Sequence, residues 1–124
     1  MDFNPNKAIY LQIADHICEQ ILLGHYELES KIPSVRELAI DLGVNPNTVM
    51  RTYDFLQQHG IIFNKRGVGF FVAMESFKEI KIYKREIFKK EDLPQLFKNI
   101  YFLDISLDEL TEMYESFIKQ NYKS

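Results

Sequence analysis

A helix with clearly marked ends is predicted between Asn45 and Gly60, in the stretch "VNPNTVMRTYDFLQQHG". Asparagine is a favoured helix N-cap, and proline suits the first helical position because the N–H group there needs no partner within the helix. Glycine is the usual residue just beyond a helix end. At about 100° per residue, Val49, Tyr53 and Leu56 form one apolar stripe, by which the helix is expected to pack.

The opposite flank of this helix carries hydrogen-bonding groups near the N-terminal end. Asn47 and Arg51 lie on that flank, and Thr48 lies at its margin. A helix that only filled a core would not need such side chains there. We therefore expect a helix that is packed by its back and presents short polar groups and one guanidinium in front.

Two further helices are predicted upstream. The first runs from about Lys7 to Leu23. The second starts at Ser34, with Glu37 three residues on, which is the spacing of a capping box. It runs through "VRELAIDL" to a Gly-Val turn, and the helix described above follows at once. Two short helices joined by a tight glycine turn form a helix-turn-helix unit.

The residues after Gly60 read as two strands, "IIFN" and "GFFVA", around the basic turn "KRGVG". A helix-turn-helix followed by such a hairpin is a winged-helix arrangement. The pattern then returns to helix at about 75–90, 92–103 and 107–121, with Pro94 in the first turn of the middle helix. The predicted fold is mainly α with a small β-hairpin. It comprises a winged helix-turn-helix DNA-binding domain over residues 1–74 and a helical tail over residues 75–124.

The chain of 124 residues has a net charge of −3, but the charge is unevenly distributed. Residues 1–30 carry one basic and five acidic side chains, a net charge of −4. Residues 31–73 carry five basic and three acidic side chains (+2), and residues 74–124 carry nine and ten (−1). Salt screens charges over about 10 Å, so local charge governs attraction to a polyanion. The helix-turn-helix and its wing form the net-basic segment.

Simple counts argue against several classes of protein. No apolar run approaches the roughly 18 residues that span a bilayer, and the N-terminus lacks a signal-peptide pattern. The single cysteine, Cys18, leaves no intramolecular disulfide and favours a reducing, cytoplasmic setting; it is expected to be a small core residue. His16 and Cys18 are two residues apart on a helix and point away from each other, so no metal site is predicted. No nucleophile, base and orienter set is present, so neither catalysis nor a cofactor is expected.

The run from Ala8 to Val72 resembles the GntR family of bacterial transcription regulators. The matching stretches are "AIYLQIADHICEQILLGHY", "KIPSVRELAIDLGVNPNTVMRTYDFLQQHGII" and "KRGVGFFV", which together cover over half the chain. The short helical tail, in place of a large ligand-binding domain, is similar to the YtrA-type subfamily, in which the tail serves mainly for dimerisation.

The resemblance implies DNA contacts from three places: the start of the second helix, the helix from Asn45 (the recognition helix) and the wing. The residues it implies are Ser34, Arg36, Asn45, Asn47, Thr48, Arg51, Arg66, Gly67 and Gly69. Lys65 beside Arg66 adds charge at the wing, for a minor-groove or backbone contact. Two structural alternatives stay open. Ser34 is equally explained as a helix cap, and the wing glycines as turn residues.

The bases that the recognition helix would read are not fixed by the sequence. Arginine can pair with guanine O6 and N7, and asparagine with adenine, or either can meet only phosphate. Two positions depart from the family pattern. Glu29 stands in a loop where glycine is usual, which leaves the conformation of that turn open. Phe55 stands where a polar residue is common, which suggests extra packing or a contact with the tail.

The tail is too small to be a stable domain alone, because three short helices bury too little surface. It is expected to pack on the winged helix, on a second copy, or on both. A two-fold homodimer is predicted because winged-helix proteins of this kind read palindromes with paired half-sites. A pocket among the tail aromatics for an unidentified small-molecule effector is an alternative use. The expected subunit contacts are Phe77, Ile80, Tyr83, Ile87, Leu107, Leu110, Tyr114 and Phe117.

The sequence therefore predicts a homodimeric regulator of transcription, a repressor that occludes a palindromic operator in double-stranded DNA. The alternative is a winged-helix module that binds another protein without sequence-specific DNA binding. That alternative predicts an apolar or acidic recognition face, whereas this helix offers Asn47, Thr48 and Arg51.

Overall fold

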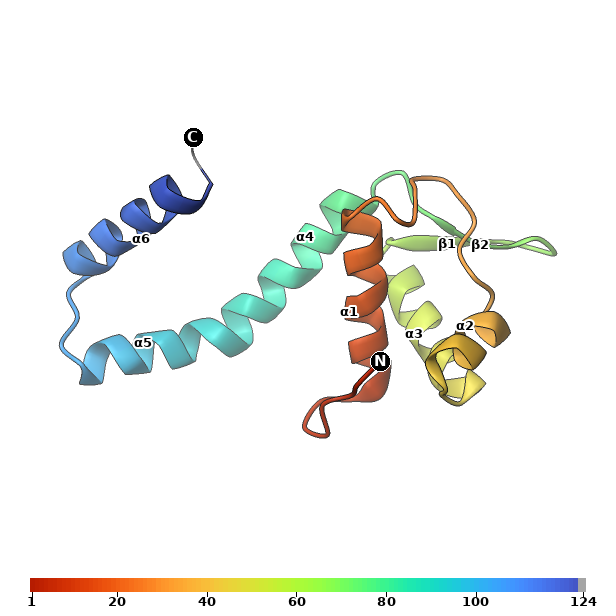
Figure 1. Cartoon of the computed structure of the whole chain (residues 1–124), viewed down its shortest axis with the longest axis horizontal. Coiled ribbons are helices and arrows are strands. Elements are labelled where there is room, and N and C mark those ends of the chain that lie inside the picture. Colours follow the sequence, from red (N-terminus) through yellow and green to blue (C-terminus); the bar gives the residue numbers. More distant parts are fainter. Residues whose placement is uncertain (123–124) are drawn as a thin grey trace. The chain divides into compact units, whose positions relative to one another are not determined.

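The structure, a computed structural model, describes residues 1–122 and is mostly helical with one two-stranded antiparallel hairpin (Figure 1). The chain divides into two compact units, one spanning Met1–Lys84 and one that begins at Arg85. The predicted fold class, a winged helix-turn-helix followed by a helical tail, is confirmed.

The first unit holds the winged helix and the start of the next helix. Figure 1 shows α1, α2 and α3 gathered beside the hairpin, with the helices and strands in the predicted order. The elements are α1 (Ile9–Leu22), α2 (Val35–Leu42), α3 (Pro46–Gln58), β1 (Ile62–Lys65), β2 (Gly69–Val72) and α4 (Ser76–Ile87), of which α4 reaches into the second unit.

Both helix starts of the helix-turn-helix are capped as predicted. The Ser34 hydroxyl accepts a hydrogen bond from the Glu37 backbone N–H, and the Ser34 N–H donates to the Glu37 carboxylate, each at 3.1 Å. The Asn45 side-chain oxygen accepts from the Asn47 N–H at 2.8 Å. Between the helices, Gly43 adopts a left-handed conformation with φ of 67°, which glycine reaches without steric cost. These local signals fix where α2 and α3 begin and how the chain turns between them.

The core of the first unit is formed by α1, α2, α3, the strands and α4. Tyr53 of α3 is fully buried, and its hydroxyl donates a 2.6 Å hydrogen bond to the Pro33 carbonyl. Cys18 is also fully buried, which confirms the expectation that it is a core residue. Other buried side chains include Ile13, Ala14, Ile17, Ile21, Ile32, Leu38, Ala39, Val49, Leu56, Ile61, Ile62 and Val72.

The first turns of α4 belong to this core, which corrects the expected subunit interface. Ile80 and Tyr83 are only 1% and 5% exposed within the single chain. Tyr83 packs edge to face on Phe55, so the suggested contact between Phe55 and the tail is confirmed. Ile80 and Tyr83 therefore fill the chain's own core and are not surface available to a partner. Phe77, in contrast, is 47% exposed.

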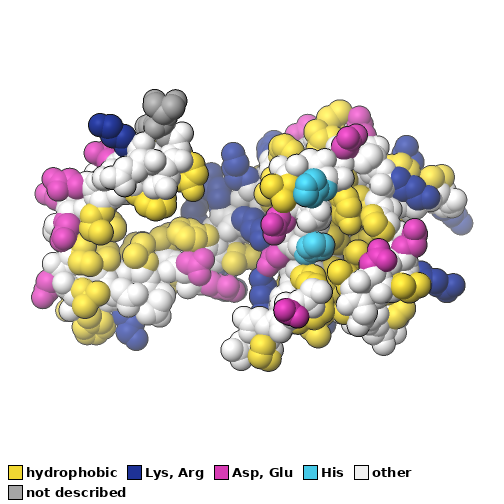
Figure 2. All heavy atoms as spheres, in the orientation of Figure 1, with side chains coloured by type: hydrophobic (Ala, Val, Ile, Leu, Met, Phe, Trp, Pro, Cys, Tyr) yellow, Lys and Arg dark blue, Asp and Glu magenta, His cyan; other side chains and the backbone are white. Residues whose placement is uncertain are grey.

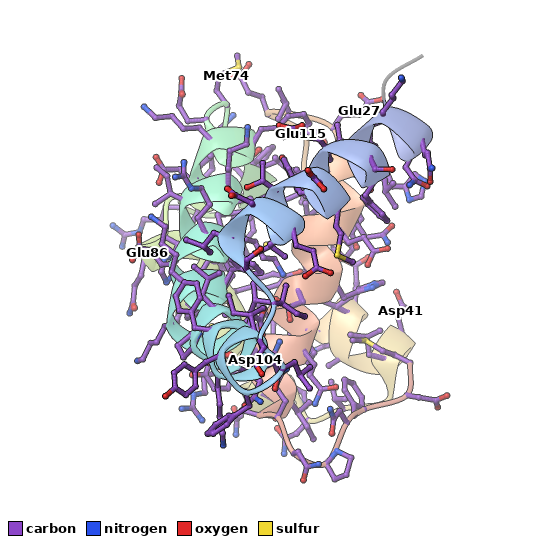
Figure 3. All side chains as sticks on the ribbon, turned by 90° about the vertical axis from the view of Figure 1, so that its left-hand side faces the viewer. Glu27, Asp41, Met74, Glu86, Asp104 and Glu115 are labelled. Atoms are coloured by element: carbon purple, nitrogen blue, oxygen red, sulfur yellow. The ribbon has the colours of Figure 1, made fainter. Side chains whose placement is uncertain are left out.

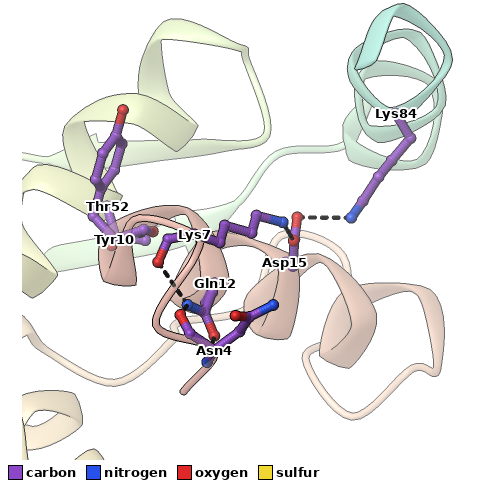
Figure 4. Close-up of polar contacts among 7 residues, drawn as sticks. All are labelled: Asn4, Lys7, Tyr10, Gln12, Asp15, Thr52 and Lys84. Carbon is purple, nitrogen blue, oxygen red and sulfur yellow. Dashed lines mark hydrogen bonds and ion pairs between the residues drawn. The ribbon is translucent and has the colours of Figure 1, made fainter. Parts of the chain in front are cut away.

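Asp15 of α1 links the same part of α4 to the start of the chain (Figure 4). Its carboxylate accepts from the Lys84 ammonium at 2.7 Å and is also paired with Lys7. All three side chains are partly exposed to solvent, so the pairs contribute little to stability and mainly orient α4 on α1.

The loop before α2 runs along β2. Ile32 N–H donates to Phe70 O at 2.9 Å, and Lys31 forms an antiparallel bridge with Phe71. Glu29 N–H donates to Val72 O at 2.9 Å. Glu29 takes the left-handed conformation, with φ of 61°, which glycine would adopt without strain. The turn thus keeps a glycine-like conformation with a glutamate in it.

The second unit contains the end of α4, a π-helical turn η1 (Phe88–Asp92), α5 (Leu93–Phe102) and α6 (Leu107–Asn121). The predicted break near residue 91 is absent. The backbone is right-handed helical at Ile87, Asp92 and Leu93. Pro94 cannot donate to the carbonyl four residues earlier, and its ring would clash with it. The widened turn, in which Leu93 N–H donates to Phe88 O, lets the helix continue past the proline.

The turn that joins α5 to α6 contains Asp104, which has a φ of 55° (Figure 3). Ser106 then caps α6, and its hydroxyl accepts from the Glu109 N–H at 3.1 Å. Among the described residues from Arg85 to Tyr122, no side chain is buried. Figure 2 shows hydrophobic side chains on the surface of these helices. The exposed ones include Phe97, Tyr101, Phe102, Leu107, Met113, Tyr114 and Phe117.

Candidate nucleic-acid interface

The recognition helix α3 has a buried side and a polar side, as predicted. Val49, Tyr53 and Leu56 are fully buried, while Asn47 and Arg51 are exposed and Thr48 is half-buried. The three polar residues border one shallow hollow of about 330 Å³. Its remaining walls come from the start of α1, namely Ala8, Ile9 and Tyr10. The structure thus brings the predicted residues of α3 together on one face, beside the N-terminal end of α1.

Arg51 lies over an aromatic ring. Its guanidinium carbon is 3.9 Å from the centre of the Tyr10 ring, within the range of a cation–π interaction. The residues of the first helix give no indication of this contact with Arg51. Pairs so distant along the chain leave no local signal in the sequence.

The first turn of α2 carries Ser34 and Arg36. Arg36 is exposed, whereas the Ser34 hydroxyl and N–H are both used in the capping box. The hydrogen bond from the Ser34 backbone holds the pKa of Glu37 below its usual range, and the Ser34 side chain adds to this effect. A carboxylate therefore already sits at this helix N-terminus. This favours the capping alternative for Ser34 and leaves Arg36 as the group free to meet a phosphate.

The wing is a tight turn between the strands. Val68 N–H donates to Lys65 O at 2.9 Å, and Gly67 has a φ of 78°, so glycine is needed there. Arg66 is exposed at the tip, and the Lys65 ammonium lies 4.5 Å from the centre of the Phe71 ring.

Gly69 at the base of the wing has a close neighbour that sequence reasoning missed. A Cβ built on Gly69 would lie 2.8 Å from the Lys31 side chain, and the backbone φ there is 143°. The Lys31 side chain therefore lies beside Gly69 at the base of the wing, which adds a third basic group to Lys65 and Arg66. The bridge between Lys31 and Phe71 causes this placement.

Other kinds of site find no support in residues 1–122. Within that range no cluster of three or more His, Cys, Asp or Glu side chains could hold a metal ion. No helix in the same range is long and apolar enough to cross a membrane.

Comparison with known proteins agrees with this geometry. Residues 9–72 match the family described as bacterial regulatory proteins, gntR family. The chain is 35% identical to the HTH-type transcriptional repressor YtrA of Bacillus subtilis, over 90% of this chain and 85% of that protein.

Two solved structures extend the likeness to the fold. A protein from Bacteroides thetaiotaomicron, described as a transcriptional regulator of the GntR family, is 51% identical with a TM-score of 0.80. The match covers 91% of this chain and 98% of that one. The DNA-binding domain of AraR, solved with its operator, is 31% identical with a TM-score of 0.50, over 52% of this chain and 77% of that one.

The family match spans the helix-turn-helix and the wing, and the match to YtrA continues through most of the helical tail. The proteins so described are transcription regulators and not enzymes. This chain therefore belongs to the GntR family, as a transcription regulator with a DNA-binding winged helix-turn-helix and a short YtrA-like tail.

Proposed function

We propose that the protein is a homodimeric repressor that acts in the cytoplasm and reads a palindromic operator with α3 and the wing. The observation that carries this proposal is the two-sided recognition helix. Its apolar side is fully buried, and Asn47, Thr48 and Arg51 share the other side. AraR, whose DNA-binding domain has the same fold, is seen with its operator, which supports a DNA duplex as the partner here.

Each part of the interface has a proposed role. Arg51 and Asn47 read base edges in the major groove, and Thr48 contacts a base or phosphate. Arg36 meets a phosphate beside α2, and Asn45 and Ser34 hold the helix starts in place. The basic wing follows the DNA backbone or minor groove. Its members are Lys65, Arg66, Gly67 and Gly69, joined by Lys31.

The homodimer is proposed because the second unit leaves its apolar faces uncovered. No described side chain from Arg85 onward is buried in the single chain, and large aromatic groups such as Tyr114 and Phe117 are more than half exposed. A patch of this kind is typical of an association surface. We propose residues 1–74 as the DNA-binding domain and residues 75–124 as the dimerisation tail, with the first turns of α4 packing on the former. The proposed subunit contacts are Phe77, Ile87, Leu107, Leu110, Tyr114 and Phe117.

Repression is proposed from the relative YtrA, which is described as a repressor. A dimer bound across a promoter blocks polymerase by occupying the same DNA, which requires no further activity of the protein. A small-molecule effector that releases the dimer from DNA is compatible with this scheme.

Selection from random double-stranded DNA by the full-length protein tests the proposal, followed by mobility-shift titration of the selected sequence. We expect an inverted repeat bound by two chains. Arg51→Ala should weaken operator binding by about 1–3 kcal/mol per half-site. Arg85→Ala removes a matched exposed guanidinium on α4 and should leave binding unchanged. If the selection yields no preferred DNA sequence, the alternative of a winged helix that binds another protein is favoured.

Size-exclusion chromatography with light scattering tests the dimer separately. The full-length chain should have twice the mass of one chain at tens of micromolar. A monomer at that concentration would overturn the palindromic mechanism, even if single half-sites were still bound.

A further inference from the structure

We infer that Tyr10 positions the guanidinium of Arg51 for base reading, so that a residue of α1 helps to set operator selectivity without itself touching a base. This inference rests on the proposed function of α3. It names a further residue that acts on recognition through Arg51.

The guanidinium of Arg51 lies over the Tyr10 ring, which can serve as a platform for it. The Arg51 guanidinium carbon lies 3.9 Å from the centre of the Tyr10 ring. A guanidinium stacked by its flat face keeps the N–H groups along its edge free for two parallel hydrogen bonds. Arg51 and Tyr10 also border the hollow that Asn47 and Thr48 line, so the pair lies on the recognition face.

The platform itself is held in place from two directions. The Thr52 hydroxyl donates to the Tyr10 carbonyl at 2.8 Å, which ties the start of α1 to α3 (Figure 4). The Phe55 ring meets the Tyr10 ring nearly at right angles, with centroids 5.9 Å apart. Thr52 is fully buried and Tyr10 is half-buried, so this hydrogen bond is partly shielded from water. Tyr10 is thus anchored at both its backbone and its ring, and its ring offers a fixed surface.

A fixed arginine has an advantage over a free one. The side chain of arginine loses rotamer freedom when it is held against a base, and this loss opposes binding. Stacking on Tyr10 restricts Arg51 before DNA arrives, so less freedom is lost on binding. The simpler reading is that Tyr10 only fills the space between α1 and α3, in which case its loss would act on folding and not on selectivity.

A double-mutant cycle separates these readings. Full-length wild type, Tyr10→Leu, Arg51→Ala and the double variant are titrated with the selected operator and with an operator altered at the base pair that depends on Arg51. Tyr10→Leu should weaken operator binding about two- to fivefold per half-site, the range of an exposed cation–π contact. In a protein that already carries Arg51→Ala, Tyr10→Leu should cause no further loss of operator affinity. Tyr10→Phe keeps the ring and should bind like wild type.

Two further measurements keep the test decisive. Thermal unfolding shows whether each variant is folded. If Tyr10→Leu is not folded, Tyr10→Met takes its place in the cycle. In the DNA-free protein, the side-chain N–H resonance of Arg51 should move when Tyr10→Leu removes the ring current, and not with Tyr10→Phe.

The outcomes distinguish the inference from the function on which it rests. Suppose that the wild type selects an operator. If Tyr10→Leu is then equally selective, or if it weakens binding by the same factor with and without Arg51, the positioning role of Tyr10 is refuted and the proposed function stands. If the wild type selects no sequence, the proposed function fails and the role of Tyr10 in it fails too.

Discussion

The rings of Phe55 and Tyr83 meet edge to face, with centroids 5.2 Å apart and planes at 75°. The His59 ring lies 4.5 Å from Phe55 and 4.9 Å from Tyr83, which completes a small aromatic cluster. Two of these residues belong to the recognition helix or its C-cap, and Tyr83 belongs to α4. The first helix after the wing is therefore part of the packing that supports α3.

Truncation should reveal this dependence. A fragment of residues 1–84 keeps Ile80 and Tyr83 and should fold, whereas residues 1–74 lose both of these buried side chains. Each large-to-small change in a core typically costs about 2–5 kcal/mol, so the shorter fragment should be less stable by at least that much. Urea unfolding of the two fragments measures the difference. Equal stabilities would show that α4 adds nothing to the winged helix.

Glu29→Gly should stabilise the protein by up to about 1.5 kcal/mol. A left-handed conformation destabilises a residue that has a Cβ by roughly 1–2 kcal/mol. Glycine removes this strain, but its more flexible unfolded state lowers the free energy of unfolding by about 0.5–1 kcal/mol. Glu29→Ala is the matched control, because it removes the charge and keeps the strain. Thermal unfolding of both variants is the measurement. A gain with alanine equal to that with glycine would assign the effect to charge.

Cys18 should be inert towards thiol reagents in the folded protein. Burial raises the pKa of its thiol from 9.0 to about 11, so the reactive thiolate is scarce at pH 8, and the side chain is closed to solvent. We expect negligible labelling by iodoacetamide in buffer and complete labelling in denaturant. Rapid labelling under native conditions would mean that the α1 core opens readily.

The capping box of α2 should make stability depend on pH. Hydrogen bonds from Ser34 lower the pKa of Glu37 below its ordinary value of 4.5. Because the folded pKa is the lower one, this contribution is fully present above pH 4.5 and is lost as the pH falls through the folded pKa. Glu37→Gln keeps an acceptor and removes the charge. The stability difference between wild type and this variant should therefore shrink in acid, and a difference that is constant from pH 7 to pH 3 would contradict this.

The wing should govern the salt dependence of DNA binding. With about three to four phosphates neutralised per subunit, the slope of log affinity against log salt should be about −5 to −7 for a dimer. Lys65→Glu with Arg66→Glu should flatten this slope and weaken binding to operator and random DNA alike. Arg51→Ala is the contrast, since it should act mainly on the operator. An unchanged slope in the wing variant would exclude the tip from the DNA interface.

Local signals in the sequence predict much of this structure, and contacts between distant residues account for what they miss. Ser34, Asn45 and Gly43 determine short-range geometry, so the helix starts and the turn follow from residue type and spacing. The stacking of Arg51 on Tyr10 joins residues 41 positions apart, which no local pattern records. The burial of Tyr83 depends likewise on Phe55, and periodicity alone cannot say which neighbour covers an apolar face.

Proline near the end of a helical pattern has a similar ambiguity. Pro94 suits the first turn of a new helix, and it equally suits a continuous helix that widens by one residue. The choice depends on whether Leu93 N–H can reach the carbonyl of Phe88, which it does here. The path of the backbone around residues 88–93 decides between these two outcomes.

The uncovered helices after Arg85 have a consequence for how the tail exchanges its amide hydrogens. A helix of 15 residues such as α6 is marginally stable in water when nothing packs against it, whatever its caps. In a chain whose tail is bare, the amides of α5 and α6 exchange with solvent almost as fast as those of a free peptide, while those of α1 and α3 are protected by the core. Deuterium uptake in α6 is thus a direct gauge of how much of the tail is covered at a given protein concentration.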